Sequence, residues 1–393
     1  MSITSFTPPQ RTLMGPGPSD IHPRVLAAMS KPTLGHLDPA FIEMMDQMKQ
    51  LLQYAFQTKN EMTLPISAPG SAGMECCFAN LVERGDKAVI CKNGVFSTRM
   101  LENVERCGGE AIVIEDEWGQ PADPNKLEDA LKANPGVKIV GAVHAETATG
   151  ARSDVKTLAE IAHRHGALII VDAVTSLAGI ELRVDDWGID AIYSGSQKCL
   201  SCTPGLSPVS FGPRAQERIQ ARQSKIQSWF LDQTLVMGYW GNGGGKRAYH
   251  HTAPINALYA LHEALVLLQE EGLEQSWERH LFNHNALKAG LEAMGLELPV
   301  DPSCRLPQLN VVKIPDGIDD GAVRTALLTE YSLEIGAGLG AGAGKVWRIG
   351  LMGHASSKKN VILCLTALDS VLGRLGAPIH QGAGARAALA VYR

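Results

Sequence analysis

Two residues at the ends of apolar runs carry the clearest chemical signal in this sequence. Asp172 ends the apolar run 167–171, and Lys198 follows the run 191–193 in the segment Ser-Gly-Ser-Gln-Lys. A carboxylate at the end of a buried strand is costly unless a cation or hydrogen bonds compensate it. A lysine, unlike an arginine, can lose its proton and attack a carbonyl to form a Schiff base. Taken singly, each residue has a plainer interpretation: Asp172 as a helix cap and Lys198 as a solvated surface charge.

Considered together, the two residues favour a site for pyridoxal 5'-phosphate. In such a site a carboxylate keeps the pyridine nitrogen protonated and a lysine binds the aldehyde carbon. The segment 67–75, SAPGSAGME, lies between an apolar run and a helix, and it offers small residues and backbone N–H groups at a helix N-terminus. A glycine-rich turn alone is usually only a turn. Together with the lysine and the aspartate, it predicts the phosphate subsite that this cofactor needs.

Short apolar runs separated by helical segments must position these residues. The runs lie at 87–91, 110–115, 137–144, 167–174 and 191–195. Runs that are apolar on both faces, with helices between them, predict a parallel sheet covered on both sides. We therefore expect an α/β fold in which ligands bind outside the carboxyl ends of the strands.

The pattern changes on either side of this region and indicates three parts. Residues 1–20 contain four prolines and predict an extended N-terminal arm. Residues 21–274 are expected to form a large ligand-binding domain. A long helix from about residue 254 to 294, without a break, is expected to lead into a smaller α+β domain at 275–393.

Composition and charge argue against several classes of protein. The 393 residues are 45% hydrophobic and 20% charged, as is usual for globular proteins. A net charge of −5 leaves no basic surplus for phosphate backbones, so nucleic acid is not an expected partner. No segment approaches about 18 apolar residues and the first twenty residues lack a leader pattern, so we expect a cytoplasmic protein that does not span a membrane. The eight cysteines show no framework spacing and are expected to be reduced thiols.

Several other patterns resemble binding motifs but lack a necessary part. Cys199-x-x-Cys202 has no second ligand pair for zinc, so we expect both cysteines to pack behind the lysine. The loop 336–344, GAGLGAGAG, has dinucleotide-like glycine spacing, but no strand–turn–helix unit with an acidic residue follows it. No carboxylate cluster completes a metal site at either of two histidine pairs, so no metal is predicted: His163 and His165, and His250 and His251.

Seven segments in consistent order carry a wider resemblance: MGPGPSDIHPRVLAAM, GHLDPAF, HAETATGA, VDAVTSLAG, YSGSQKCL, YHHTAPINALYALHEAL and KVWRIGLMG. From about residue 11 to residue 370 the chain resembles the class V (fold type I) pyridoxal-phosphate aminotransferases. More narrowly, it is similar to the alanine–glyoxylate, serine–pyruvate and serine–glyoxylate group. The resemblance implies a mostly parallel seven-stranded sheet sandwiched by helices, with a smaller α+β C-terminal domain.

The same resemblance implies roles for individual cofactor-binding residues. Lys198 would be the Schiff-base lysine and would move the proton between the substrate Cα and the cofactor, while Asp172 would pair with the pyridine nitrogen. Phe96 would stack on the cofactor ring, where animal members commonly have tryptophan, and Thr147 would hydrogen-bond the phenolic oxygen. The phosphate would be held by the following residues, the last two from a neighbouring subunit: Gly70, Ser71, Gln197, Tyr249 and Thr252.

Substrate binding and assembly also follow from the resemblance. Arg348 would bind the substrate α-carboxylate, a role that suits the planar fork of a guanidinium. Gly17 and His36 would lie near the substrate. The shared phosphate site implies a homodimer. Pro69 departs from the Ser or Thr of many relatives and removes a hydroxyl and an N–H from the phosphate site, a role that we expect Ser71 to take over in part.

The implied reaction is a ping-pong transamination from alanine or serine to glyoxylate or pyruvate. A second interpretation is an (S)-ureidoglycine–glyoxylate aminotransferase, because the tail GAGARAALAVY and the segment DEWG resemble that group. Those enzymes have amide side chains near the positions of His36 and Tyr249, and this chain has neither amide. A lyase such as a cysteine desulfurase would need a reactive cysteine on a mobile loop, for which Cys304 is the candidate. A non-enzymatic binding protein would have lost Lys198 or Arg348, and both are present.

Overall fold

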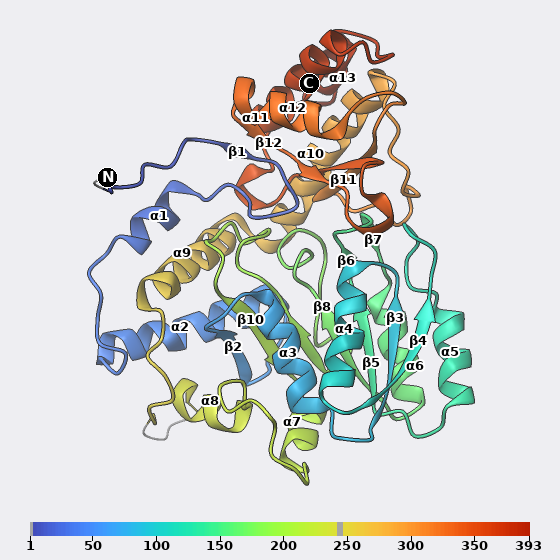
Figure 1. Ribbon diagram of the computed structural model, residues 1–393. Helices are drawn as coiled ribbons and strands as arrows, with labels where there is room; N and C mark the ends of the chain where they lie inside the picture. Colours follow the sequence, from blue (N-terminus) through green and yellow to red (C-terminus); the bar gives the residue numbers. More distant parts are fainter. Residues whose placement is uncertain (1–2, 242–246) are drawn as a thin grey trace.

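The computed structural model describes residues 3–241 and 247–393 of the chain. Within them, a seven-stranded sheet forms the centre of the larger part, in the order β2-β10-β9-β8-β5-β3-β4 (Figure 1). Neighbouring strands from β9 to β4 are parallel, and β10 is antiparallel to both of its neighbours. The predicted mostly parallel sheet is therefore confirmed. The strands span Met62–Ile66 (β2), Lys87–Lys92 (β3), Glu110–Glu115 (β4), Ile139–Val143 (β5), Leu168–Asp172 (β8), Ala191–Tyr193 (β9) and Ser207–Phe211 (β10).

The antiparallel strand β10 is the one that the sequence pattern does not reveal. Two serines and Pro208 interrupt its apolar character, yet all five of its residues are buried. Buried hydroxyls need partners, and Ser210 has one because its Oγ lies 2.8 Å from Oγ1 of Thr63 on β2. The strand is therefore stabilised by contacts between strands and not by a local pattern.

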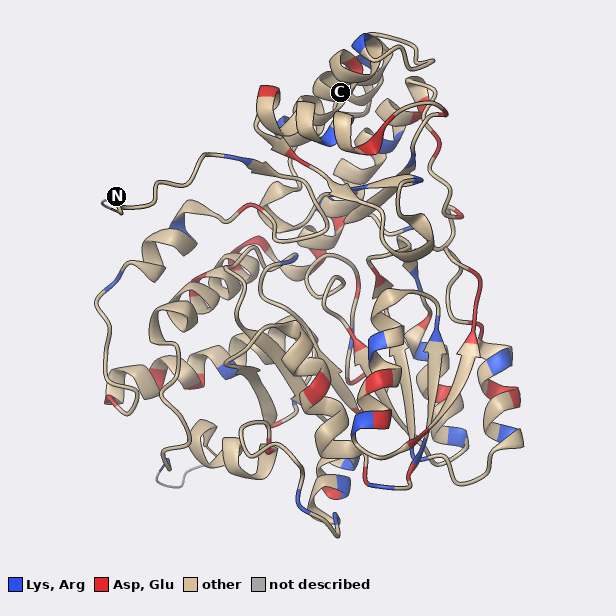
Figure 2. Ribbon diagram, viewed as in Figure 1, with Lys and Arg blue, Asp and Glu red and all other residues tan. Residues whose placement is uncertain are grey.

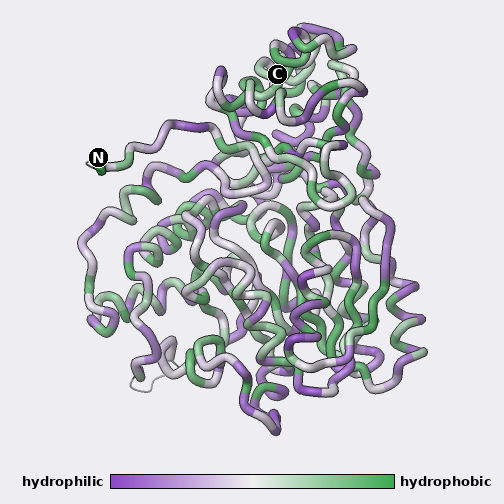
Figure 3. Tube along the Cα trace, in the orientation of Figure 1, coloured by the Kyte–Doolittle hydropathy of each residue, from purple (hydrophilic) through white to green (hydrophobic). Residues whose placement is uncertain are grey.

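Helices cover both faces of the sheet. α3 (Gly70–Leu81) and α4 (Val95–Arg106) pack together on one face, and α5 (Pro124–Ala133) and α6 (Val155–Arg164) pack together on the other (Figure 1). All residues of β5 and β8 are consequently buried. Burial on both faces explains why these runs are continuously apolar and do not alternate. Figure 3 shows the same arrangement as hydrophobic strands between helices with polar outer surfaces.

The long helix expected between residues 254 and 294 is two helices, so the prediction of an unbroken helix was wrong. α9 (Ile255–Glu271) ends at Gly272, whose φ is 91°, and α10 (Leu273–Ala293) begins directly after it. This left-handed conformation suits glycine and stops the helical hydrogen-bond pattern. The other helices around the large sheet are α1 (Pro23–Met29), α2 (Pro39–Phe56), α7 (Pro213–Gln220) and α8 (Gln233–Trp240).

A smaller unit with its own core lies beyond the carboxyl edge of the sheet. Its three-stranded antiparallel sheet is β11 (Leu309–Lys313), β14 (Val346–Gly350) and β13 (Gly336–Ala337). The N-terminal arm joins this unit, because β1 (Thr12–Leu13) pairs with β12 (Leu333–Glu334) and Met14 is buried in the same core. Its helices are α11 (Asp320–Tyr331), α12 (Lys358–Arg374) and α13 (Ala383–Val391), with short 3₁₀ turns at Gly340–Gly342 and Gly353–Ala355.

The two separate cores support a division of the chain near residue 275, and we propose the boundaries 1–20, 21–274 and 275–393 on that basis. Positive and negative side chains are interspersed over the outer helices (Figure 2). Among the described residues, no helix combines the length and apolar character required to cross a bilayer.

Candidate active site

The carboxyl ends of β8 and β9 place a buried carboxylate at the edge of the sheet. Asp172 ends β8 and is in register with Tyr193, which ends β9. One carboxylate oxygen of Asp172 accepts a hydrogen bond from the Tyr193 hydroxyl (2.8 Å), and the other accepts one from the backbone N–H of Val174 (2.8 Å). Burial raises the pKa of Asp172 to about 6, and the two hydrogen bonds limit the rise. Asp172 is therefore a fixed acceptor where ligands of α/β sheets bind.

The Lys198 side chain lies against the N-terminal arm. Its Nζ donates to the carbonyl oxygen of Pro16, and the Ser19 hydroxyl donates to the Lys198 carbonyl (2.8 Å). Gly17 has a φ of 106°, and a Cβ at this position would lie 2.5 Å from Lys198 Nζ. Burial lowers the pKa of the Lys198 amine to about 8, and the positive charge of Arg348 acts in the same direction. The amine loses its proton more easily than an exposed lysine does, as a nucleophile requires.

The segment predicted to bind phosphate has unused hydrogen-bonding capacity. α3 begins at Gly70, directly after its N-cap residue Pro69, which makes no side-chain hydrogen bond to the first turn. The N–H groups of a first helical turn lack helical partners and attract anions. Gly70 packs tightly, since a Cβ there would lie 3.3 Å from Cγ2 of Val174, whereas Ser71 is exposed. The carboxamide of Gln197 follows in the adjacent loop, and its Oε1 is buried without a hydrogen-bond partner in the described part of the chain.

Arg348 on β14 is a buried cation that forms no ion pair with the described residues. Its Nε donates to the carbonyl of Ala337 (2.7 Å) and its Nη1 to the carbonyl of Thr147 (3.2 Å). Only 7% of the residue is exposed, and no carboxylate of residues 3–241 or 247–393 lies within ion-pair distance. Burial lowers the pKa of Arg348 to about 10, and the charge of Glu146 opposes this change. Because an unpaired buried charge is costly, this arrangement suits an anionic ligand.

Phe96 and Thr147 come from different elements that meet beside Arg348. Phe96 lies in the first turn of α4, with the Arg99 guanidinium 4.9 Å from the centre of its ring. Thr147 is buried in the turn between β6 (Ala145–Glu146) and β7 (Ala151–Arg152). The carboxylate of Glu146 joins them, since it accepts hydrogen bonds from the backbone N–H groups of Phe96 (3.1 Å) and Ala148 (3.0 Å).

Two residues at this site were missed by the sequence analysis. Tyr193 was treated only as part of an apolar run. The available signal was that two parallel strands each end in a residue with a polar group, Asp172 and Tyr193, and these two residues are in register. Glu146 lies in the segment HAETATGA, next to Thr147, and no role was predicted for it. A carboxylate three residues beyond the fully buried strand β5 was the available signal in the second case.

Three of the predicted residues form a separate group near the surface. Tyr249 is 60% exposed, its hydroxyl lies 3.4 Å from Oγ1 of Thr252, and its ring centre is 5.0 Å from that of His36. Next to them, the Nε2 of His251 lies 2.7 Å from the Ser67 hydroxyl, which precedes the phosphate segment. In the described part of the chain, no hydrogen bond connects this group to Lys198.

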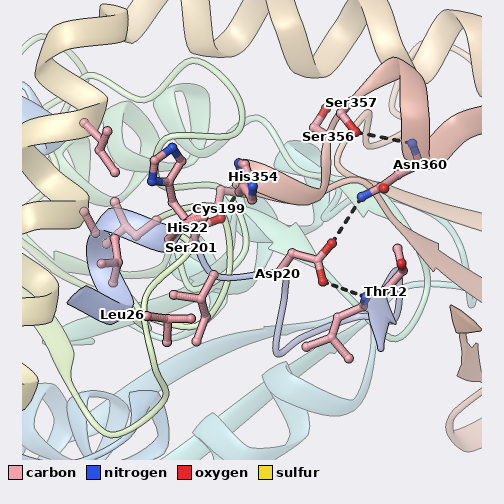
Figure 4. A pocket seen from close by; sticks show the side chains of 18 of the residues that line it. Thr12, Asp20, His22, Leu26, Cys199, Ser201, His354, Ser356, Ser357 and Asn360 are labelled. Carbon is pink, nitrogen blue, oxygen red and sulfur yellow. Dashed lines mark hydrogen bonds between the residues drawn. The ribbon is translucent and has the colours of Figure 1, made fainter. Parts of the chain in front are cut away.

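A cavity of about 1130 Å³ lies behind the lysine loop and is distinct from these residues (Figure 4). Cys199, Ser201, His22 and His354 line it, but Lys198, Asp172 and Arg348 do not. Burial raises the pKa values of the Cys199 and Cys202 thiols to about 12 and about 11, so both are poor nucleophiles. Cys304 is also buried, and burial raises its pKa. Among the described residues, no group of three or more His, Cys, Asp or Glu side chains is arranged to hold a metal ion.

The donor set fits a planar phosphate-bearing ligand such as pyridoxal 5'-phosphate. It combines an amine of lowered pKa, a buried acceptor for a protonated ring nitrogen, an aromatic ring and an uncapped helix N-terminus. Arg348 adds a separate site for a carboxylate. Such a set can bind a carbonyl compound covalently and orient an amino acid beside it.

Comparisons with known proteins agree with this geometry. The model of the family "Aminotransferase class-V" matches residues 13–361. The crystal structure of ureidoglycine–glyoxylate aminotransferase from Bacillus subtilis is 41% identical, with a TM-score of 0.96 over 99% of this chain and 100% of that one. That of alanine–glyoxylate aminotransferase from Nostoc sp. is 45% identical, with a TM-score of 0.92 over 95% of this chain and 98% of that one. Alanine–glyoxylate aminotransferase of Felis catus is 38% identical over 93% of this chain and 88% of that protein.

Proposed function

Because this chain belongs to the class-V aminotransferase family and is an aminotransferase, we propose that it uses pyridoxal 5'-phosphate to transfer the amino group of alanine or serine to glyoxylate or pyruvate. Its fold extends over the full length of two aminotransferases that act on glyoxylate, as their names state. The proposal therefore concerns the cofactor, the substrates and the residues that act on them.

The cofactor would occupy the space between α3, β8 and the lysine loop. When bound, pyridoxal phosphate supplies an electron-withdrawing ring that stabilises negative charge at the substrate Cα. Asp172 keeps the ring nitrogen protonated, and the Tyr193 hydroxyl holds the carboxylate in place. The first turn of α3 at Gly70 and Ser71 binds the phosphate. The Gln197 carboxamide, whose buried oxygen has no partner among the described residues, would complete that site by turning its NH₂ group toward the phosphate.

Lys198 would hold the cofactor at its aldehyde carbon and, once the amino group of the substrate has displaced it, its free amine would act as the base for the substrate. Its lowered pKa leaves a useful fraction of neutral amine near neutral pH, so the amine could take the proton from the substrate Cα and deliver it to the cofactor carbon that had carried the aldehyde. Phe96 covers the ring and Thr147 donates to its phenolic oxygen. The arm at Pro16 and Gly17 closes the site over the amine, which favours small substrates.

The observation that carries this proposal is the buried Arg348, which has no carboxylate within ion-pair distance among the described residues. Two of its N–H groups are used by backbone carbonyls, and the remaining donors are available to a planar anion. An α-carboxylate fits the guanidinium fork and supplies the missing counter-charge. Amino and oxo acids share this group, so one arginine serves both half-reactions.

The exposed group of His36, Tyr249 and Thr252 supports a homodimer with shared active sites. These side chains lie apart from Lys198 of their own chain but carry the polar groups expected at the phosphate of a second one. Exposed apolar side chains on nearby segments, which a second copy would cover, include Leu34, Leu37, Trp229 and Phe230. We propose a cytoplasmic location for this dimer.

A second candidate, (S)-ureidoglycine–glyoxylate aminotransferase, is favoured by the similarity to the Bacillus subtilis enzyme. It ranks below the first because His36 and Tyr249 replace the amides expected there. The two candidates differ in the amino donor and not in the chemistry at Lys198.

A donor panel tests the proposal. Alanine, serine and ureidoglycine are each mixed with the loaded enzyme, and conversion of the cofactor to its amine form is followed by absorbance, with glyoxylate or pyruvate then added. We expect conversion by alanine or serine, and a large rise in KM for these donors in Arg348→Gln. The matched control is Arg222→Gln, since Arg222 also donates to backbone carbonyls, those of Asn80 and Val82, but at the C-terminal end of α3. Preference for ureidoglycine would establish the second candidate, and failure of every donor would refute both.

A further inference from the structure

Glu146 is a fully buried carboxylate that none of the roles above uses. It lies at the end of β6, and its side chain is 0% exposed. Its Oε2 accepts a hydrogen bond from the Phe96 N–H (3.1 Å) and its Oε1 accepts one from the Ala148 N–H (3.0 Å). Both carboxylate oxygens are therefore engaged by backbone groups on opposite sides, one on α4 and one in the turn that follows β6.

The contact with α4 depends on a glycine. Gly94 precedes α4 and has no side chain with which to cap it, and a Cβ at this position would collide with Cγ and Cδ of Glu146. The glutamate occupies the place of a cap and lies at the positive end of the helix, where a carboxylate is favourable. Gly94 and Glu146 thus form a matched pair across two elements.

The contact with the turn reaches the other wall of the cofactor site. Thr147 lies between Glu146 and Ala148, and its carbonyl accepts the hydrogen bond from Nη1 of Arg348. The chain of contacts runs from the α4 residue Phe96 through the Glu146 carboxylate to the Thr147 turn and then to Arg348. The aromatic ring, the threonine and the arginine are otherwise on separate elements of the fold.

We propose that Glu146 is a positioning residue that holds Phe96 and the Thr147 turn at a fixed spacing, so that the aromatic ring lies flat against the cofactor. This inference rests on the proposed function, because it assigns Phe96 to the cofactor ring. Burial raises the pKa of Glu146 to about 7. Burial is thus unfavourable for this carboxylate, which agrees with its being retained for the hydrogen bonds that it accepts.

Glu146→Gln is the sharpest test because it keeps the size of the side chain. A carboxamide has one acceptor oxygen, so one of the two N–H groups would face an NH₂ and lose its partner. We expect pyridoxal 5'-phosphate to bind the cofactor-free variant about 10-fold or more weakly, and the visible circular dichroism of the bound cofactor to fall as the ring loses its fixed orientation. Lys198 still links to the cofactor, so reduction with borohydride should give the same mass increase as in the wild type.

The matched control is Asp190→Asn. Asp190 is also a buried carboxylate that accepts a backbone N–H, that of Ile169 (2.9 Å), but it precedes β9 at the opposite end of the sheet. It should lower the free energy of unfolding without changing cofactor affinity or circular dichroism. Thus a loss of folding alone does not imitate the expected result.

A double-mutant cycle keeps the inference testable if Glu146→Gln folds poorly. Gly94→Ala forces the carboxylate aside, whereas in Gly94→Ala combined with Glu146→Ala there is no carboxylate to displace. We therefore expect the two changes to be strongly non-additive in cofactor affinity. Additive effects, or a Glu146→Gln protein with wild-type affinity and circular dichroism, would overturn the inference. A wild-type protein that does not bind pyridoxal 5'-phosphate would instead refute the proposed function.

Discussion

Tyr193→Phe isolates the hydrogen bond that holds Asp172. The substitution keeps the buried ring and removes the hydroxyl that donates to the carboxylate at 2.8 Å. A hydrogen bond to a charged group contributes about 1.5–3 kcal/mol. Because the bond favours the ionised carboxylate, its loss should move the pKa of Asp172 upward from about 6 by roughly one to two pH units.

The sign of the effect on stability follows from the raised pKa. In the cofactor-free protein, Asp172 ionises at about 6 when folded and near its ordinary value of 3.8 when unfolded. The folded state therefore binds more protons between these values, and its stability falls as the pH rises through them. In Tyr193→Phe this decline should continue to higher pH, because the carboxylate has lost a stabilising donor.

Urea unfolding of the cofactor-free proteins at two pH values measures the difference. We expect Tyr193→Phe to cost about 1 kcal/mol near pH 4.5, where Asp172 is protonated, and about 2–3 kcal/mol near pH 8. The pH at which cofactor affinity falls on the acid side should rise together with the pKa of Asp172. Tyr239→Phe is the matched control, since this buried tyrosine donates to the neutral carbonyl of His36 (2.8 Å). Equal losses at both pH values in Tyr193→Phe would refute the coupling to Asp172.

Two further predictions concern the arm and the second subunit. Gly17→Ala should reduce kcat/KM by up to about 100-fold, because alanine is strained at a φ of 106° and its Cβ meets Lys198 Nζ. The control is Gly15→Ala, which should be near wild type because the nearest atom to the added Cβ lies at 3.7 Å. Equal kinetics for the two variants would contradict the close approach of the arm to Lys198. Refolding Lys198→Ala together with a Tyr249→Ala/Thr252→Ala double variant should restore about a quarter of wild-type activity, because half of the dimers are hybrids with one intact site. No recovery in this mixture would mean that Tyr249 and Thr252 do not act in the partner's site.

The parallel strands could be predicted because they are continuously apolar: the central ones are buried on both faces, although the edge strand β4 is partly exposed. Five continuous apolar runs coincide with β3, β4, β5, β8 and β9, and helices lie between them as expected. Local pattern failed where conformation depends on a single residue or on a neighbour. Gly272 divides a periodic helical segment, and β10 is buried despite two serines and a proline.

For the candidate site, residue type was informative where the chemistry is specific. A lysine and an aspartate at successive strand ends suggested a carbonyl cofactor, and the fold brings both ends to one edge. Residue type was not informative for Tyr193 and Glu146, because tyrosine is common in strands and glutamate is common in loops. Their roles depend on which backbone and side-chain groups face them.

The sequence alone therefore determined the class of fold and the resemblance to class V aminotransferases, and it singled out Lys198 and Asp172 as candidates, since each follows from local composition or from motifs in order. Only the tertiary structure decided that Arg348 is buried with no ion-pair partner in the described part of the chain, that Gly17 must approach the lysine, and that one carboxylate connects Phe96 to the Thr147 turn. These properties arise from contacts between residues that are far apart along the chain. Burial and distance, and not residue type, give them their energies.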